Sequence, residues 1–549
     1  MRRERKTMST RSKMSHEIEH KVGGGGILTK KGFWILVGMN IFILIAFIVP
    51  TPQTLVETLE KYGYVKKMMD WGIAHNTIEA ADKAMIVLGI VPMAIIFFAT
   101  EAVPIGVTGI MMPILAYFFN LLPFNMVGKT FAGDAPMFML GVFALGTTVV
   151  KVGFHNRLAV WILGWTRGFW VPMIVLCISM SIVGSFLSAP AMCSFMVPVL
   201  MAVYFGVVSA NSPDGKVVHD PALAKFLLFS LCFSLNVGGV GTPSAGGRNV
   251  IMMGFFNDYH IPITYFGWMK YGWPMVPLGG LIVFFYMMIM FGRKIKTRNL
   301  TPGLEVIKKE IRKMGKMVYA EYITAGMLFL IVTLWILGGE GVGLGGPALL
   351  ALVIPVLFKI VDWKKILGGI SWDAWFMYCG ALTLGALLKE SGGALWLAKS
   401  FLNILSSANM DSGYGLWVGM SGFSGLVTNF MSDAATVALI GPIVIPMGIM
   451  TGVPGEPWAT GLSVAFASSY AHFLIVGSPT NALTYALGIY PDKDERVIKT
   501  IDFVKYGFVL WILSMLLLWI VELLVIYPLN GFPEGLLETA TRVLKSAAQ

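Results

Sequence analysis

The sequence predicts an all-α polytopic membrane protein with about 11 transmembrane helices plus two re-entrant helical hairpins, built as two inverted repeats. Composition is the first reason: hydrophobic residues make up 56% of the 549 positions and charged residues only 13%. Soluble proteins carry about 25% charged residues, so this chain lacks the polar surface that a soluble core needs. The 62 glycines and 27 prolines fit helices that are broken inside the membrane. A bilayer tolerates such breaks only where protein covers the backbone or water reaches it.

Two basic segments are the second reason, and they orient the chain. Residues 1–31 hold nine Lys or Arg against three Glu, and residues 293–316 hold nine against two Glu. Together these segments exceed the net charge of +11 of the whole chain, which argues against a general nucleic-acid-binding surface. Under the positive-inside rule both are cytoplasmic, so an even number of spans separates them. One leading span plus five spans per repeat meets this condition, and an odd number of spans per repeat inverts the second repeat.

An internal repeat is the third reason. The segment from Asp134 to Gly146 is echoed by the segment from Asp373 to Gly385. Ser188 precedes Pro198 by ten residues, as Ser432 precedes Pro442, and the loop 241–249 corresponds loosely to the loop 477–481. Three landmarks in the same order favour a duplicated fold over a fortuitous similarity within one helical bundle.

These observations predict six regions along the chain. They are a basic cytoplasmic arm (1–31), a first transmembrane helix with an amphipathic extracytoplasmic insertion (32–84), a first repeat with its hairpin (85–292), a basic cytoplasmic linker (293–321), a second repeat with its hairpin (322–528) and a C-terminal tail (529–549).

Two short polar segments interrupt apolar runs at matched positions of the repeats, around Ser188 and around Ser432. Pro190 breaks a helix because it cannot donate a backbone hydrogen bond. The N–H groups at the start of the following half-helix favour an anion, and the freed carbonyls and hydroxyls suit Na⁺. A lone serine in a membrane helix usually bonds its own backbone, but two such segments at matched positions indicate a binding site.

Two charged residues lie inside apolar surroundings, where burial is costly: Arg248 in the loop 241–249 and Asp433 beside Ser432. The guanidinium fork of an arginine suits carboxylate, sulfate or sulfonate oxygens. An aspartate ligates a cation or carries a proton. The alternative is a structural pairing of the two residues with each other or with the backbone.

Enzymatic chemistry is not expected. The sequence contains no nucleotide-binding Gly-Lys motif, no paired-histidine metalloprotease motif and no catalytic triad. The four cysteines lie in apolar stretches without metal-ligand spacing, so we expect them to be small core residues.

The chain resembles the divalent anion/sodium symporter (DASS) family over roughly residues 85–528. Thr100 to Thr108 is similar to the family's Thr-Glu-Ala-Leu-Pro segment, and the two polar segments occupy the places of its two Ser-Asn-Thr hairpin tips. Two Thr-Pro-Pro-Asn-like loops match 242–249 and 478–481. The resemblance implies that the substrate is bound by Ser188, Ala189, Pro190, Thr242, Arg248, Asn249, Ser432, Asp433, Ala434, Ser478, Pro479 and Asn481. It implies a Na⁺ or H⁺ site formed by Thr428, Ser432, Asp433, Gly477 and Pro479.

The departures from the family pattern lie at the two tips and in the first loop. The first tip has Ala189 and Pro190 in place of the amide and second hydroxyl, and Arg248 stands where the first loop normally has a proline. The second tip has Asp433 in place of the amide. Our hypothesis is that Arg248 replaces the charge of the first sodium ion and helps to hold the anion, while Asp433 serves the one remaining coupling cation.

The expected function is secondary active transport, as a symporter or exchanger, of a small dianion across the inner membrane. A dicarboxylate, sulfate and an organic sulfonate all fit. The resemblance implies an elevator-like mechanism in a homodimer embedded in the lipid bilayer, with Na⁺ or H⁺ as coupling ion and with no cofactor or nucleic-acid partner. The alternative is a cation/proton antiporter or an oxyanion efflux permease of the same superfamily.

Overall fold

The structure is a computed structural model that describes residues 31–546 except 155–156, 158–167, 213–216, 262, 339–341, 494 and 534. The predicted basic arm therefore lies outside the described residues, apart from Lys31. The described chain is helical, and its only paired extended residues form one isolated bridge between Ile489 and Arg496. Nine helical stretches in this described part are long and apolar enough to cross a membrane. The predicted all-α membrane class is confirmed, while the number of spans stays a prediction.

The first half of the chain runs through eleven helical elements. They are α5 (Thr77–Thr100), α6 (Ile105–Phe118), α7 (Phe124–Ala132), α8 (Asp134–Val152), α10 (Trp170–Phe186), α11 (Ala189–Ala210), α12 (Pro221–Gly238), η4 (Pro243–Ala245), α13 (Gly247–Asp258), α14 (Tyr265–Gly272) and α15 (Met275–Phe291).

The second half follows the same plan and ends in a long span assembled from α-helical and π-helical pieces. Its elements are α17 (Tyr319–Leu337), α19 (Gly345–Leu357), α20 (Trp363–Leu367), α21 (Trp372–Glu390), α22 (Gly393–Ser406), α23 (Gly413–Val427), α24 (Asp433–Met450), α25 (Glu456–Ala467), α26 (Pro479–Leu487), α27 (Thr500–Asp502), η5 (Phe503–Gly507), α28 (Phe508–Leu517), η6 (Leu518–Ile526) and α29 (Tyr527–Asn530).

Six further elements lie outside these two halves. They are α2 (Lys31–Ile43), η2 (Leu44–Ile48), α3 (Gln53–Lys61), α4 (Tyr64–Asp70), α16 (Thr301–Met314) and α30 (Leu536–Ser546).

The packing of helices repeats between the halves at a constant spacing. Helix α6 packs on α21, and α19 packs on α8. A Cβ added at Gly380 would collide with the backbone of Gly109, and one added at Gly141 would collide with the backbone of Ala348. Position 348 follows 109 by 239 residues, and 380 follows 141 by the same 239. Equivalent small residues thus let equivalent helix pairs approach closely, as small residues do in membrane bundles.

The aspartates that open the repeated segments each lie beside the start of a helix of the opposite half. The Asp134 carboxylate accepts hydrogen bonds from the backbone N–H groups of Leu344 (3.0 Å) and Gly345 (2.8 Å), at the start of α19. In the other half, Asp373 lies against Gly106 at the start of α6, where an added Cβ would be 2.6 Å from its Oδ1. A carboxylate at a helix N-terminus satisfies unpaired N–H groups and the helix dipole.

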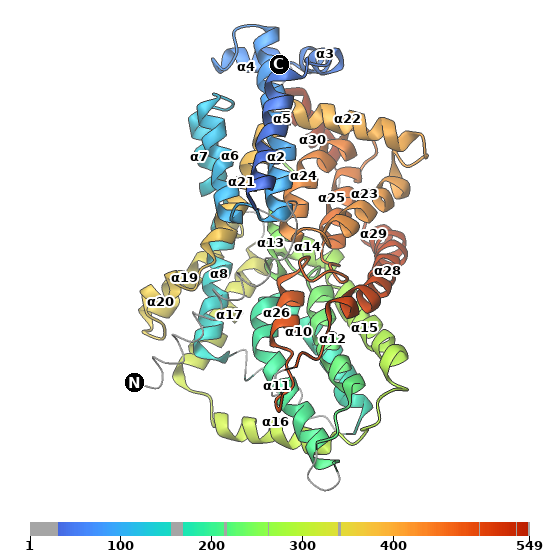
Figure 1. Cartoon of the computed structure of the whole chain (residues 1–549). Coiled ribbons are helices and arrows are strands. Elements are labelled where there is room, and N and C mark those ends of the chain that lie inside the picture. Colours follow the sequence, from blue (N-terminus) through green and yellow to red (C-terminus); the bar gives the residue numbers. More distant parts are fainter. Residues whose placement is uncertain are drawn as a thin grey trace.

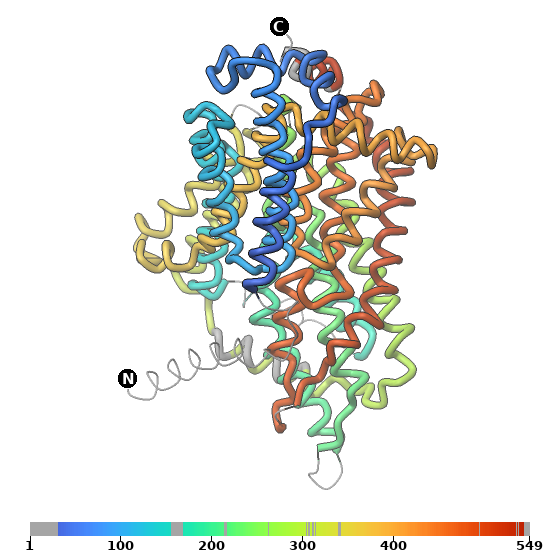
Figure 2. Tube along the Cα trace, turned by 45° about the horizontal axis from the view of Figure 1, so that its top comes forward, coloured from blue at the N-terminus to red at the C-terminus, as the bar shows by residue number. Residues whose placement is uncertain are grey.

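The two hairpins lie toward opposite ends of the molecule (Figure 1). Helices α10, α11 and α12 occupy the lower half of the view, and α23, α24 and α25 occupy the upper half. The insertion helices α3 and α4 lie at the top, which the turned view also shows (Figure 2), and the linker helix α16 lies near the bottom of Figure 1. This arrangement is the one expected for halves of opposite orientation.

The insertion is attached to the elbow between α21 and α22. Lys67 pairs with Glu390 at 2.6 Å, and the Trp396 indole donates to Thr54 at 3.0 Å. Gly392 has φ +73°, and a Cβ there would lie 2.5 Å from Leu59, so the elbow accepts only glycine. All four cysteines are buried and free, as predicted.

Candidate substrate and cation site

Four helix breaks supply the candidate site, two in each half. The hairpin α10–α11 breaks before Ala189, and the hairpin α23–α24 breaks over residues 428–432. The α12–α13 and α25–α26 helices are interrupted over 239–246 and 468–478. Proline stands in the first turn of both α11 and α26, where its missing N–H costs no helical hydrogen bond. Each break is therefore followed by a fresh helix N-terminus whose N–H groups are available to an anion.

Two asparagines close the interrupted loops in the same way. The Asn249 amide donates to the carbonyl of Gly239 (2.9 Å) and of Thr242 (2.7 Å), which lie ten and seven residues earlier. The Asn481 amide donates to the carbonyls of the residues ten and seven positions before it, Ala471 (2.7 Å) and Leu474 (2.8 Å). The loose sequence correspondence between the two loops therefore reflects one shared hydrogen-bond pattern.

The acceptor atoms of these asparagines differ. The Asn481 carbonyl accepts from the Asn236 amide (2.9 Å) and from the Cys232 thiol (3.1 Å). The buried Asn249 carbonyl has no hydrogen-bond partner in the described part of the chain. Buried polar atoms are nearly always paired, so this oxygen is suited to a cation or a water molecule.

Each hairpin is hydrogen-bonded to the loop of its own half. The Thr242 hydroxyl donates to the Ser185 carbonyl at the end of α10. The Thr428 hydroxyl donates to the Ser468 carbonyl at 2.8 Å. Hairpin and interrupted helix are thus tied into one unit in both halves.

Arg248 joins the two halves. Its Nη1 forms an ion pair with the Asp433 carboxylate, and its Nε donates to the Ser469 hydroxyl at 2.7 Å. The side chain of Arg248 is 7% exposed and that of Asp433 is 22% exposed. A Cβ at Gly239 or Gly246 would strike the guanidinium, so these two glycines leave the room that it occupies.

The ion pair is placed between two helix N-termini. Arg248 is the second residue of α13 and Asp433 is the first residue of α24. A carboxylate is favourable at such an end, whereas a cation there is unfavourable unless an anion neutralises it. The anion that Arg248 requires is, in this arrangement, Asp433.

The remaining residues that the sequence predicts for the site do not share one common arrangement. Ser432 caps α24 by accepting from the Ala435 N–H at 3.3 Å, and Ser478 donates to Asn236 at 3.2 Å. Gly477 packs against the Thr428 carbonyl, so two of the predicted cation ligands do lie together.

At the first tip, Ser188 is exposed and makes no capping hydrogen bond, while Ala189 and Pro190 are half-buried. In the described structure no hydrogen bond links this tip to Arg248. Ala434 is buried and Pro479 is exposed.

Comparison with known proteins agrees with this architecture. A sequence model of the sodium:sulfate symporter transmembrane region matches residues 30–530. The chain belongs to this symporter family. It is a multi-pass secondary transporter of the plasma membrane.

Relatives of this symporter-family chain are transporters. The sodium-dependent dicarboxylate transporter SdcS of Staphylococcus saprophyticus is 25% identical over 433 residues, which cover 74% of this chain and 81% of the relative. The sodium-dependent high-affinity dicarboxylate transporter 3 of Caenorhabditis elegans is 23% identical over 444 residues, covering 73% and 77%. An uncharacterised transporter of Haemophilus influenzae is 25% identical, covering 79% and 90%.

Two solved structures share the fold alone. The YdaH transporter of Alcanivorax borkumensis superposes with a TM-score of 0.51 at 15% identity, over 75% of this chain and 89% of that chain. MtrF of Neisseria gonorrhoeae, described as an antimetabolite efflux pump, gives 0.50 at 13% identity, over 73% and 84%.

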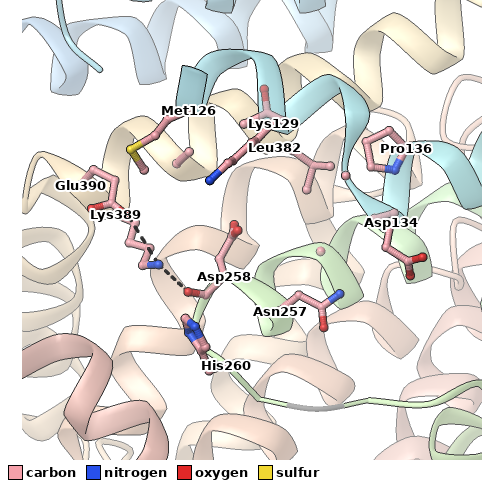
Figure 3. Close-up of a pocket in the computed structure, with 15 residues that line it drawn as sticks. Met126, Lys129, Asp134, Pro136, Asn257, Asp258, His260, Leu382, Lys389 and Glu390 are labelled. Carbon is pink, nitrogen blue, oxygen red and sulfur yellow. Dashed lines mark hydrogen bonds and ion pairs between the residues drawn. The ribbon is translucent and has the colours of Figure 1, made fainter. Parts of the chain in front are cut away.

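A second polar region lies at the far end of α13 (Figure 3). It is a cavity of about 360 Å³ between α7, α8, α13 and α21. Lys129 and Asp258 point into it, and Lys389 donates to the Asp258 carbonyl. Glu390 pairs with Lys67 and, at 3.5 Å, with Lys389. The cavity is separated from Arg248 by the length of α13, about 15 Å at 1.5 Å per residue.

Three residues of the site were missed at the level of sequence: Asn236, Ser469 and Tyr378, whose hydroxyl lies against Gly247. Asn236 could have been identified from the sequence, since an amide inside the apolar run 224–240 needs a partner. Ser469 and Tyr378 could not have been identified in this way, because serines and tyrosines are frequent throughout this chain.

Proposed function

We propose that this transporter moves a small dianion, such as a dicarboxylate, sulfate or an organic sulfonate, in a process coupled to Na⁺ or H⁺. The observation that carries the proposal is the Arg248–Asp433 ion pair at the meeting point of the helix breaks. The relatives named as sodium-dependent dicarboxylate transporters support the substrate class and the coupling ion.

The anion is expected to displace Asp433 from Arg248. Asp433 meets the guanidinium through Oδ2 alone, while its Oδ1 accepts from the Ala434 N–H, and a carboxylate or sulfate can offer two oxygens to the same guanidinium. The N-termini of α13 and α24 already favour negative charge at this position. An incoming anion therefore finds a site shaped for an anion but occupied by one from the protein itself.

The cation is expected to bind Asp433 once the anion has displaced Asp433 from Arg248. Removing one partner of a buried ion pair costs about 3–5 kcal/mol, because the remaining charge is uncompensated. Asp433 is 22% exposed, which favours the lower end of that range. A cost of about 3 kcal/mol weakens the binding of either ligand alone about 10²-fold. Simultaneous binding of anion and cation avoids this cost. Each ligand therefore strengthens the binding of the other, which couples the two.

Movement is expected to be elevator-like and to occur in a homodimer. The glycine-mediated helix pairs α6–α21 and α8–α19 are suited to form a fixed frame. The hairpins and interrupted helices, tied together by Thr242 and Thr428, are suited to move against it as one unit.

The test is transport by purified protein in liposomes. Radiolabelled succinate, sulfate and ethanesulfonate are offered under an imposed Na⁺ gradient, a proton gradient or internal unlabelled anion. We expect uptake of at least one anion that a cation gradient accelerates. Uptake that depends only on internal anion identifies an exchanger. Cation flux without flux of any anion refutes the proposal and favours the antiporter alternative.

A further inference from the structure

Glu522 is an isolated acid in the last membrane span. It lies in the middle of the π-helical segment η6 and is fully buried, with 0% exposure. Neither of its carboxyl oxygens has a hydrogen-bond partner in the described part of the chain. Buried polar groups are almost always paired, and an ionisable residue inside a membrane span is by default a functional candidate. Helical turns of the π type are also frequent at functional sites.

The groups that face Glu522 are phenols. Tyr271 from α14, Tyr470 from the loop after α25 and Tyr527 from α29 interact with it electrostatically. The Tyr527 hydroxyl donates to the Ala459 carbonyl, so this phenol is engaged elsewhere. In the described structure no lysine, arginine or histidine compensates a charge on Glu522.

The other titratable side chains of the helices packed on η6 have partners of their own. Three residues belong to this set: Glu456 of α25, which accepts from the Gly413 N–H (2.6 Å), Tyr286 of α15, which donates to the Tyr506 carbonyl (2.8 Å), and Tyr414 of α23, which donates to the Trp519 carbonyl (3.0 Å). None of these hydrogen bonds reaches Glu522.

One residue links this acid to the ion pair. Tyr470 lies within electrostatic range of both Glu522 and Arg248. Its neighbour in the chain, Ser469, accepts the hydrogen bond from Arg248 Nε. The segment 469–470 is therefore close both to Glu522 and to the ion pair.

We propose that Glu522 is a proton-binding site that carries one H⁺ in the transport cycle. The inference rests on the proposed transport function and names the proton as a coupling ion. In the buried arrangement Glu522 holds the proton as a neutral acid, because a lone carboxylate in an apolar interior costs several kcal/mol. When the same segment meets water in the other arrangement, the carboxyl group releases H⁺ and becomes a carboxylate.

A purely structural acid predicts different behaviour. Glutamine has the shape of a neutral glutamic acid, so Glu522→Gln would leave every function of a structural residue unchanged. It removes only the ability to bind and release a proton. Glu522→Asp keeps the acid and serves as the conservative variant.

The experiment measures anion uptake and internal pH together in liposomes that contain a trapped pH dye. The substrate is whichever of radiolabelled succinate, sulfate or ethanesulfonate the wild type takes up. In the wild type, an inward proton gradient should accelerate uptake, and uptake should acidify the interior. Glu522→Gln should lose both effects while keeping anion binding and anion exchange. Glu456→Gln is the control, because Glu456 is also a fully buried acid but accepts a hydrogen bond from the Gly413 N–H, and it should keep both effects.

A second measurement does not require a transporting variant. Infrared spectra at neutral pH should show the carbonyl band of a protonated carboxyl group that Glu522→Asp shifts and Glu522→Gln removes. A band unchanged in both variants overturns the proposal. So does a Glu522→Gln protein with undiminished proton stimulation, or a wild type whose anion uptake is insensitive to protons. A wild type that moves no anion refutes the proposed function instead.

Discussion

Replacing Asp433 by asparagine should make anion binding independent of the cation. In the structure Asp433 neutralises Arg248, and under our proposal an anion binds by displacing it. Two unit charges 4 Å apart at an effective dielectric of 20 attract each other by about 4 kcal/mol. The 22% exposure of Asp433 reduces this value, and we take about 3 kcal/mol as the competition that the anion must overcome. Asp433→Asn should therefore tighten cation-free anion binding about 10²-fold.

The assay is equilibrium binding of the radiolabelled anion to purified protein, with and without Na⁺ and at two pH values. In the wild type the cation should tighten anion binding, and in Asp433→Asn the two curves should coincide. The exposed acid Asp411 supplies the matched control, because Asp411→Asn changes the net charge equally and should leave the cation dependence intact. If Asp433→Asn binds anion without cation as weakly as the wild type does, the competition argument is wrong.

Three further substitutions probe the same site from its surroundings. Gly239→Ala should abolish uptake without removing any charge, because the new methyl group takes the space of the Arg248 guanidinium; uptake at the wild-type rate would contradict that packing. Thr428→Val should raise the Na⁺ concentration required for half-maximal uptake, since it removes the hydroxyl that ties the tip to Ser468, and an unchanged Na⁺ dependence would exclude that role. Asn481→Ala should lower the free energy of unfolding by about 2–4 kcal/mol, because it removes two hydrogen bonds to carbonyls of the loop and one from the Asn236 amide. Thermal melting of the detergent-solubilised protein checks the last value, and a melting temperature equal to that of the wild type would refute it.

The membrane class, the duplicated plan and the positions of the helix breaks could be predicted from the sequence. Each depends on local or compositional causes: apolar residues select lipid, and proline and glycine interrupt helices wherever they stand. The equivalent positions of Asp134 and Asp373 in the two repeats could also be predicted from the sequence, but the physical reason for the two aspartates could not. That reason is the start of a neighbouring helix, which each carboxylate faces after folding.

Glu522 could also have been identified as a candidate site from the sequence. An acid within the apolar stretch 505–528 is rare enough to mark a candidate site by itself. Its isolation, however, is a property of packing. The phenols that surround it come from residues 271, 470 and 527, and nothing in their spacing predicts that they meet.

The sequence by itself determined that this protein lives in a bilayer, that its two halves share one plan, and that Arg248 and Asp433 are costly charges in need of partners. Only the tertiary structure decided that they are each other's partner. The two residues are 185 positions apart and belong to different halves. Local propensity acts over a few neighbouring residues, whereas a contact between halves depends on how all the intervening helices pack, and that packing places the guanidinium of one half against the carboxylate of the other.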